Sequence, residues 1–211
     1  MNGRELKELD YAEAAVLIGC EVEVIKAVTE IEAPMGGFDK INRPVILYEP
    51  FIFGDLTKQK YDGAIVTINN ENYPLSLDRK KVKWSIQNAK YGPKSIQYHK
   101  LDAAEKLDVD AAYKCCSWGR FQILGMNYKL CGYNSLDSFL TDMFSSEKYH
   151  LFAFVNFIKN KKLDKYLIEK NWIKFAEGYN GKMQNKGTET IYDDYSYKLE
   201  MAYKKLKAAN G

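Results

Sequence analysis

The chain has 211 residues, of which 46% are hydrophobic and 14% aromatic, and it carries a formal charge of +3. This length and composition predict a single domain with a substantial core. The charge is too small and too evenly spread to indicate a nucleic-acid-binding protein, and no apolar run is long enough to span a membrane. Four cysteines and two histidines without a paired CxxC pattern give no reason to expect a metal site or a cofactor.

The first residues are charged and helix-prone, and they lack the apolar segment of a secretory signal. We therefore expect a protein that is made and folded in the cytoplasm. Asp10, followed three residues later by Glu13, resembles a capping box and predicts a first helix that ends at Gly19.

A second helix is predicted over residues 21–33, where apolar residues recur at helical spacing. At about 100° per residue, Glu32 falls on the apolar side of this helix, whereas Glu30 falls on the opposite, solvated side. The stripe consists of Val24, Ile25, Val28 and Ile31.

Pro34 and the pair Gly36-Gly37 end this helix, which leaves Glu32 in its last turn. Burial and the negative end of the helix dipole both disfavour a carboxylate anion and raise its pKa. A carboxyl group that stays protonated near neutral pH can act as a general acid. The alternative interpretation is a partly exposed glutamate at a frayed helix end.

The remaining pattern is mainly helical, with a small β part. An apolar segment between two prolines, residues 43–50, predicts a strand, and the β-prone residues 64–68 between turn signals predict a hairpin or a long loop. Residues 117–125 are small, aromatic and amide residues that suit a turn lining a groove. Helices are predicted near 98–107, 136–144, 149–158, 172–179 and 195–206.

Four segments in this order resemble the N-acetylmuramidase family of phage and bacterial peptidoglycan-degrading endolysins. They are AVTEIEA (27–33), RPVILYEPFIF (43–53), SWGRFQILGMN (117–127) and WIKFAEGYNG (172–181). The resemblance extends from about Tyr11 to the final helix, and ordered motifs at compatible distances are far more specific than one short match. It implies a mainly α (α+β), lysozyme-like helical domain with a small β-hairpin or extended lobe. It also implies that residues 1–211 form one catalytic domain without a separate wall-binding module.

The resemblance places Glu32 at the position of the catalytic acid, which is the glutamate that the helical periodicity selects independently. It places Gln122 in the segment that lines the cleft and Tyr179-Asn180 at the motif that closes it. Tyr179 is expected to have its ring in the core and its hydroxyl at the cleft. Trp118 is expected either to bind a sugar or to pack in the core.

Three positions depart from the family pattern. Ala33 stands where a serine is more frequent, and Phe51 stands where a histidine is common after the glutamate. The stretch 182–190 is longer than expected after the Tyr-Asn-Gly motif, which predicts a different rim of the cleft.

The second catalytic group is less well defined by the sequence. Glu49 is the first candidate, because it follows the extended segment and matches a glutamate of the family, but a purely structural role fits it equally well. Asp39 is a weaker candidate. An inverting enzyme requires a base roughly 6.5–9.5 Å from the acid, and a retaining enzyme a nucleophile at roughly 5–5.5 Å.

The leading hypothesis is a hydrolase that cleaves the β-1,4 bond between N-acetylmuramic acid and N-acetylglucosamine. One alternative is a lytic transglycosylase, which forms 1,6-anhydro-muramic ends and needs no second carboxylate. The other is a non-catalytic peptidoglycan-binding protein. The expected partner is the glycan strand of bacterial peptidoglycan, with no nucleic acid and no membrane, and the protein is expected to be a monomer that reaches the cell wall after release from the cytoplasm.

Overall fold

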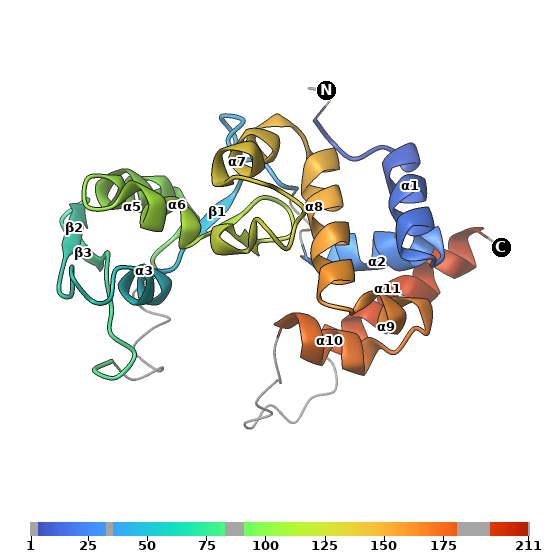
Figure 1. The fold of residues 1–211 in the computed structure, drawn as a ribbon. Helices are drawn as coiled ribbons and strands as arrows, with labels where there is room; N and C mark the ends of the chain where they lie inside the picture. Colours follow the sequence, from blue (N-terminus) through green and yellow to red (C-terminus); the bar gives the residue numbers. More distant parts are fainter. Residues whose placement is uncertain (1–3, 33–35, 83–90, 181–194, 211) are drawn as a thin grey trace.

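The computed structural model describes residues 4–32, 36–82, 91–180 and 195–210. Its helices and strands fall into two groups joined by a small central sheet (Figure 1). The helical lobe consists of α1 (Glu8–Ile18), α2 (Val22–Glu32), α8 (Glu147–Asn160), α9 (Asp164–Ile168), α10 (Trp172–Asn180) and α11 (Tyr195–Asn210). The small lobe consists of α3 (Pro50–Leu56), β2 (Ile65–Ile68), β3 (Glu71–Pro74), the 3-10 turn η1 (Lys94–Ile96), α5 (Gln97–Glu105) and α6 (Val109–Lys114). Between them lie β1 (Ile46–Tyr48), β4 (Cys116–Trp118), β5 (Ile123–Leu124), the 3-10 turn η2 (Gly125–Asn127) and α7 (Leu136–Ser145). The predicted mainly helical fold with a small β part is confirmed.

The first helix begins earlier than the sequence suggested. Asp10 is not its N-cap but accepts a hydrogen bond at 2.9 Å from the backbone N–H of Lys7, which precedes the helix. The predicted capping box was therefore placed three residues too late, because Asp10 can serve as the acidic partner of a box as well as its first residue. The predicted end is confirmed: Gly19 has φ 84° and its N–H donates to the carbonyl of Ala15.

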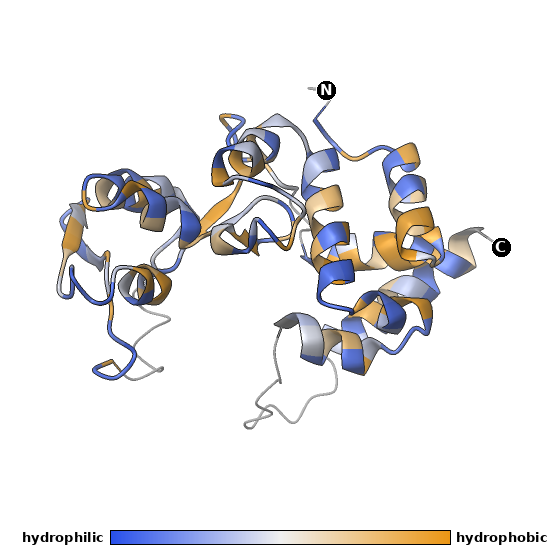
Figure 2. Ribbon diagram, in the orientation of Figure 1, coloured by the Kyte–Doolittle hydropathy of each residue, from blue (hydrophilic) through white to orange (hydrophobic). Residues whose placement is uncertain are grey.

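Helix α2 is the centre of the helical lobe. Its residues Val24, Ile25 and Val28 are fully buried, as their spacing predicted, and Ile31 is partly buried. The last helix, α11, packs along α2, and α1 packs against it as well. Hydrophobic residues of β1 and of helices α1, α2 and α8 appear in orange in Figure 2. The C-terminal part of the chain thus holds the helix that ends at Glu32.

The central sheet positions the loops of the site. Its strand order is β1-β4-β5, with both pairs antiparallel and with Ile46 opposite Trp118. Gly119 follows β4 directly and donates a hydrogen bond from its backbone N–H to the carbonyl of Val45, at 2.8 Å. The short turn between β4 and β5 is therefore fixed to the start of β1, and the segment 117–125 forms the predicted turn rather than a helix.

The predicted hairpin lies in the small lobe. Strands β2 and β3 are antiparallel, and the two residues between them, Asn69 and Asn70, have φ values of 52° and 65°. Positive φ at both central residues is typical of the tight turn that matches the twist of a hairpin, and asparagine tolerates it well. Within the described ranges, no helix is both long enough and apolar enough to cross a bilayer.

Candidate active site

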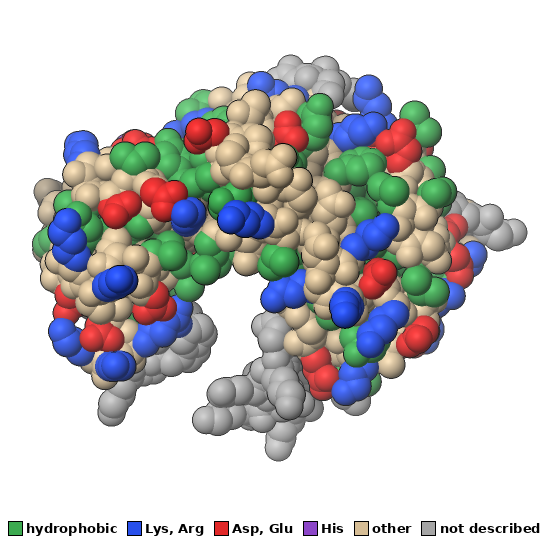
Figure 3. Space-filling view, viewed as in Figure 1, with side chains coloured by type: hydrophobic (Ala, Val, Ile, Leu, Met, Phe, Trp, Pro, Cys, Tyr) green, Lys and Arg blue, Asp and Glu red, His purple; other side chains and the backbone are tan. Residues whose placement is uncertain are grey.

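Glu32 is the last residue of α2, and its side chain is half-buried where two cavities meet. The first cavity, of about 290 Å³, is lined from the helical lobe by Glu32 and Gly36 and from the small lobe by Gly92 and Gln97. The second, of about 190 Å³, contains Glu32 together with residues of β5 and the helical lobe. Figure 3 shows that the molecule is deeply hollowed between the two lobes. Glu32 therefore lies in a cavity that is lined by residues of both lobes.

The environment of Glu32 favours its protonated form. Burial raises the pKa of this carboxyl group, and a hydrogen bond from the hydroxyl of Tyr195 lowers it, with a net increase. Tyr195 is the first residue of α11, so the close packing of α11 on α2 supplies this donor. A neutral carboxylic acid at the edge of a cavity can deliver a proton to a bound glycosidic oxygen.

Gln122 lines both cavities and lies in the turn between β4 and β5. Its φ of 47° is in the left-handed region, which is unfavourable for a residue with a side chain. Its side-chain amide donates to the carbonyls of Gly119 at 2.8 Å and Val45 at 3.2 Å. These bonds hold the residue in its strained conformation and occupy its amide nitrogen. Strained backbone positions of this kind are frequent at functional sites.

A buried histidine supports the loops on both sides of this turn. The ring of His150, on α8, lies so close to Gly37 and Gly119 that a Cβ at either glycine would come within 2.6 and 2.7 Å of its Nδ1. The Nδ1 atom accepts a hydrogen bond from the backbone N–H of Arg120 at 3.0 Å, and Nε2 lies 2.7 Å from the carbonyl of Met143. Nε2 must therefore carry the proton of a neutral ring, consistent with burial, which lowers the pKa of His150.

Next to this histidine, Glu147 and Arg120 form a buried ion pair with an N to O distance of 2.7 Å. The other oxygen of Glu147 accepts a hydrogen bond from the backbone N–H of Gly37 at 2.6 Å. The carboxylate thus connects the loop after α2 with the turn after β4, and Arg120 also lines the larger cavity. The sequence analysis did not identify this cluster. The available signal was a glutamate and a histidine three residues apart on the apolar side of α8.

The structure brings Tyr179 into the same site. It lines the smaller cavity with Glu32, its ring stacks on Phe175, and its hydroxyl donates to the carbonyl of Phe121 at 2.9 Å. Burial raises the pKa of Tyr179, and the nearby charge of Glu32 raises it further. The neighbouring Asn180 ends α10, and its side chain lies outside what the structure describes.

Trp118 does not line the cavities that contain Glu32. Its side chain is 1% exposed, its Nε1–H donates to the carbonyl of Tyr113 at 3.1 Å, and its ring stacks on that tyrosine. Of the two roles that the sequence left open for Trp118, the structure therefore shows packing in the core. A sugar platform would require an exposed ring face, so the assignment of Trp118 as a substrate-binding residue is corrected.

The two candidates for a second carboxylate line neither cavity. Glu49 precedes α3, and its carboxylate accepts a hydrogen bond from the hydroxyl of Tyr91 at 2.6 Å. Asp39 forms an ion pair with Arg43 at 2.9 Å. Burial alone would raise the pKa of Asp39, but the hydrogen bonds from Arg43 lower it below its usual value. In the described part of the chain, no group of three or more histidine, cysteine or acidic side chains is arranged to hold a metal ion.

Comparison with known proteins gives the family. The model of the N-acetylmuramidase family matches residues 21–207. The chain belongs to this family. Among solved structures, this N-acetylmuramidase is similar to the endolysin of the Burkholderia phage AP3, with 30% sequence identity and a TM-score of 0.79. The match covers 100% of this chain and 74% of the endolysin. The comparison with curated proteins gave no match. The family and this neighbour identify a glycoside hydrolase that degrades peptidoglycan, with the lysozyme-like fold that the resemblance implied.

Proposed function

We propose that this muramidase hydrolyses the β-1,4 bond between N-acetylmuramic acid and N-acetylglucosamine, with Glu32 as its general acid. The observation that carries the proposal is the position of Glu32, half-buried at the junction of two cavities and with a raised pKa. Departure of the sugar leaving group requires a proton on the glycosidic oxygen while positive charge develops on the neighbouring ring. A carboxyl group that remains neutral near pH 7 supplies that proton.

The other residues of the site have distinct proposed roles. The amide oxygen of Gln122 accepts a hydrogen bond from a substrate N-acetyl N–H or from a water molecule. Tyr179 keeps the wall of the smaller cavity in place through its bond to the carbonyl of Phe121. Asn180 and Glu49 remain sequence-based proposals for substrate binding and for the second carboxylate.

A lytic transglycosylase is the second candidate, because one specific observation favours it. Among the described residues, Glu32 is the only carboxylate that lines either cavity. A transglycosylase requires no second carboxylate, because the 6-hydroxyl of the muramic acid attacks its own anomeric carbon and a 1,6-anhydro product forms. A hydrolase requires a second group, and Glu49 is the proposal for it.

The two candidates differ in their products, so mass spectrometry decides between them. Purified peptidoglycan is treated with the unaltered protein or with the Glu32→Gln variant, and the soluble fragments are analysed. We expect reducing muramic acid ends from the unaltered protein and no fragments from the variant. Anhydro-muramic ends would assign the protein to the transglycosylases, and fragments from the variant would exclude Glu32 as the acid.

We also propose that residues 1–211 act as one catalytic domain and as a monomer on glycan strands. In this proposal the enzyme acts on the cell wall after its release from the cytoplasm. Analytical ultracentrifugation of the active protein tests the monomer, and a dimer under assay conditions would refute it.

A further inference from the structure

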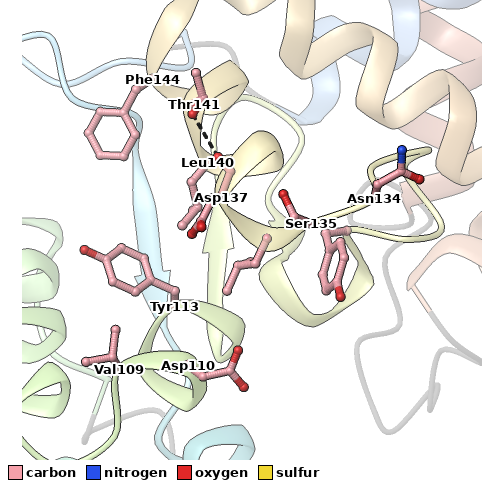
Figure 4. A pocket seen from close by; sticks show the side chains of 11 residues that line it. Val109, Asp110, Tyr113, Asn134, Ser135, Asp137, Leu140, Thr141 and Phe144 are labelled. Atoms are coloured by element: carbon pink, nitrogen blue, oxygen red, sulfur yellow. Dashed lines mark hydrogen bonds between the residues drawn. The ribbon is translucent and has the colours of Figure 1, made fainter.

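A second, larger concavity lies outside the site described above, where α6, η2 and α7 meet. It has a volume of about 810 Å³ and is open to solvent. In Figure 4, Tyr113 and Phe144 lie along one side of this groove, with Leu140 and Asp137 beside them and Asn134 towards the other end. The volume falls in the range that accommodates small ligands or a few units of a polymer.

The aromatic side of the groove is packed on the buried Trp118. The ring of Tyr113 stacks on the buried Trp118 with an angle of 10° between the ring planes, and Phe144 packs on the same indole at 6.0 Å between centroids. Although Phe144 is large and apolar, 38% of it is exposed. Rings that are held from below and open above can stack on the apolar faces of sugar rings.

The polar side of the groove consists of a carboxylate and an amide that have free hydrogen-bonding capacity. Within the described part of the chain, the side chains of Asp137 and Asn134 make no hydrogen bond or ion pair, and both residues are exposed. The hydroxyl of Thr141 donates to the backbone carbonyl of Asp137 and leaves its carboxylate unoccupied. A carboxylate accepts hydrogen bonds from sugar hydroxyls, and an amide can pair with an N-acetyl group. A second acid, Asp110, also lines the groove, and its carboxylate is paired with Lys114 at 2.6 Å.

The groove adjoins the catalytic cavities through one segment of the chain. Asn127 lines the smaller cavity with Glu32, and the next residue, Tyr128, lines the groove. Likewise, Trp118 lies beneath the groove, and the next residue, Gly119, lines the larger cavity. The walls of the groove and of the catalytic cavities thus belong to the same two segments of the chain.

We propose that this groove is an accessory binding site for N-acetylated glycan strands of peptidoglycan. It holds the polymer beside the catalytic cavities and increases the local concentration of cleavable bonds. The inference rests on the proposed substrate of the enzyme and adds a second place where that substrate binds.

The test measures binding without turnover. Glycan strands stripped of their peptide stems are titrated with the Glu32→Gln protein and with the same protein carrying Phe144→Ala or Asn134→Ala. We expect binding about three- to tenfold weaker for each added change, the range expected when one stacking or hydrogen-bonding contact is lost. The matched control is Tyr149→Ala, because Tyr149 is an aromatic residue with 41% exposure on α8 that lines none of these cavities. We expect the control to bind like its parent.

Equal affinity of the parent and both groove variants would overturn the accessory site. Asn134 is exposed, so its variant tests the site even if the Phe144 variant is unstable. A loss of affinity on peptide-bearing walls but not on stripped strands would also overturn the proposal, because the groove would then bind the peptide stem. Fragment release by the unaltered protein is measured in parallel, and its absence would refute the proposed function independently of the groove.

Discussion

Replacement of Glu147 by glutamine should strongly destabilise the protein. The side chain of Glu147 is 4% exposed and pairs with Arg120, which is 16% exposed, and it also accepts a hydrogen bond from Gly37. The variant keeps the shape of the side chain but leaves the guanidinium buried without its counter-charge. Breaking a buried pair in this way costs about 3–5 kcal/mol. We expect the free energy of unfolding to fall by that amount, and Tm to fall by about 10 °C.

Urea unfolding, followed by circular dichroism at neutral pH, measures this loss. The matched control is Glu13→Gln, which removes an ion pair with Lys148 at 3.0 Å whose side chains are 41% and 44% exposed. An exposed pair contributes about 0–1 kcal/mol, so the control should unfold close to the unaltered protein. A loss for Glu147→Gln no greater than that of the control would refute the view that this ion pair holds the two loops.

Three further outcomes are expected. Tyr195→Phe removes the hydrogen bond that lowers the pKa of Glu32, so the alkaline limb of the pH–activity profile should move to higher pH. The control Tyr203→Phe, on the same helix, should leave this limb unchanged. An unshifted limb in the Tyr195 variant would contradict the role of Glu32. Lys100 is buried, and burial lowers its pKa to about 8, so the unfolded state binds its proton more tightly and this group alone contributes a gain of about 3 kcal/mol in stability between pH 8 and 10.5. Buried thiols such as Cys20 and Cys131, whose pKa values burial raises, act in the opposite direction, so the quantity to measure is a difference between two proteins. In urea titrations the unaltered protein should gain about 3 kcal/mol relative to Lys100→Met across this range, and a constant difference would refute the role of Lys100. Gly119→Ala should lower both Tm and the rate of wall lysis, because Gly119 has a φ of +67° and the new Cβ would lie 2.7 Å from the buried ring of His150. A Tm and a rate of lysis equal to those of the unaltered protein would show that the turn relaxes freely.

Local patterns in the sequence predicted the elements of the fold and the position of Glu32. The spacing of the buried residues of α2 is a property of eleven consecutive residues, and it correctly placed Glu32 at the helix end. The hairpin turn at Asn69 and Asn70 is likewise a local signal. Local signals also mislead: Asp10 was assigned to the wrong position of a correct capping pattern, because the sequence does not show which residue begins the helix.

The support of the site could not be predicted, because it depends on partners distant in the chain. Gly37 and Glu147 are 110 residues apart, and neither is unusual in its own segment. Trp118 was ambiguous for a related reason, since a strand exposes or buries a side chain according to what packs on it. The predicted loop 182–190 and the departure at Ala33 lie outside the described residues.

The hydrogen bond between Tyr195 and Glu32 spans 163 positions of the chain. During synthesis, α2 leaves the ribosome long before α11, so the proposed acid acquires this partner only after the intervening residues have been made. A contact of such high sequence separation also requires a long loop to close before it can form, which slows folding. The environment that sets the pKa of Glu32 is therefore complete only after α11 has packed on α2.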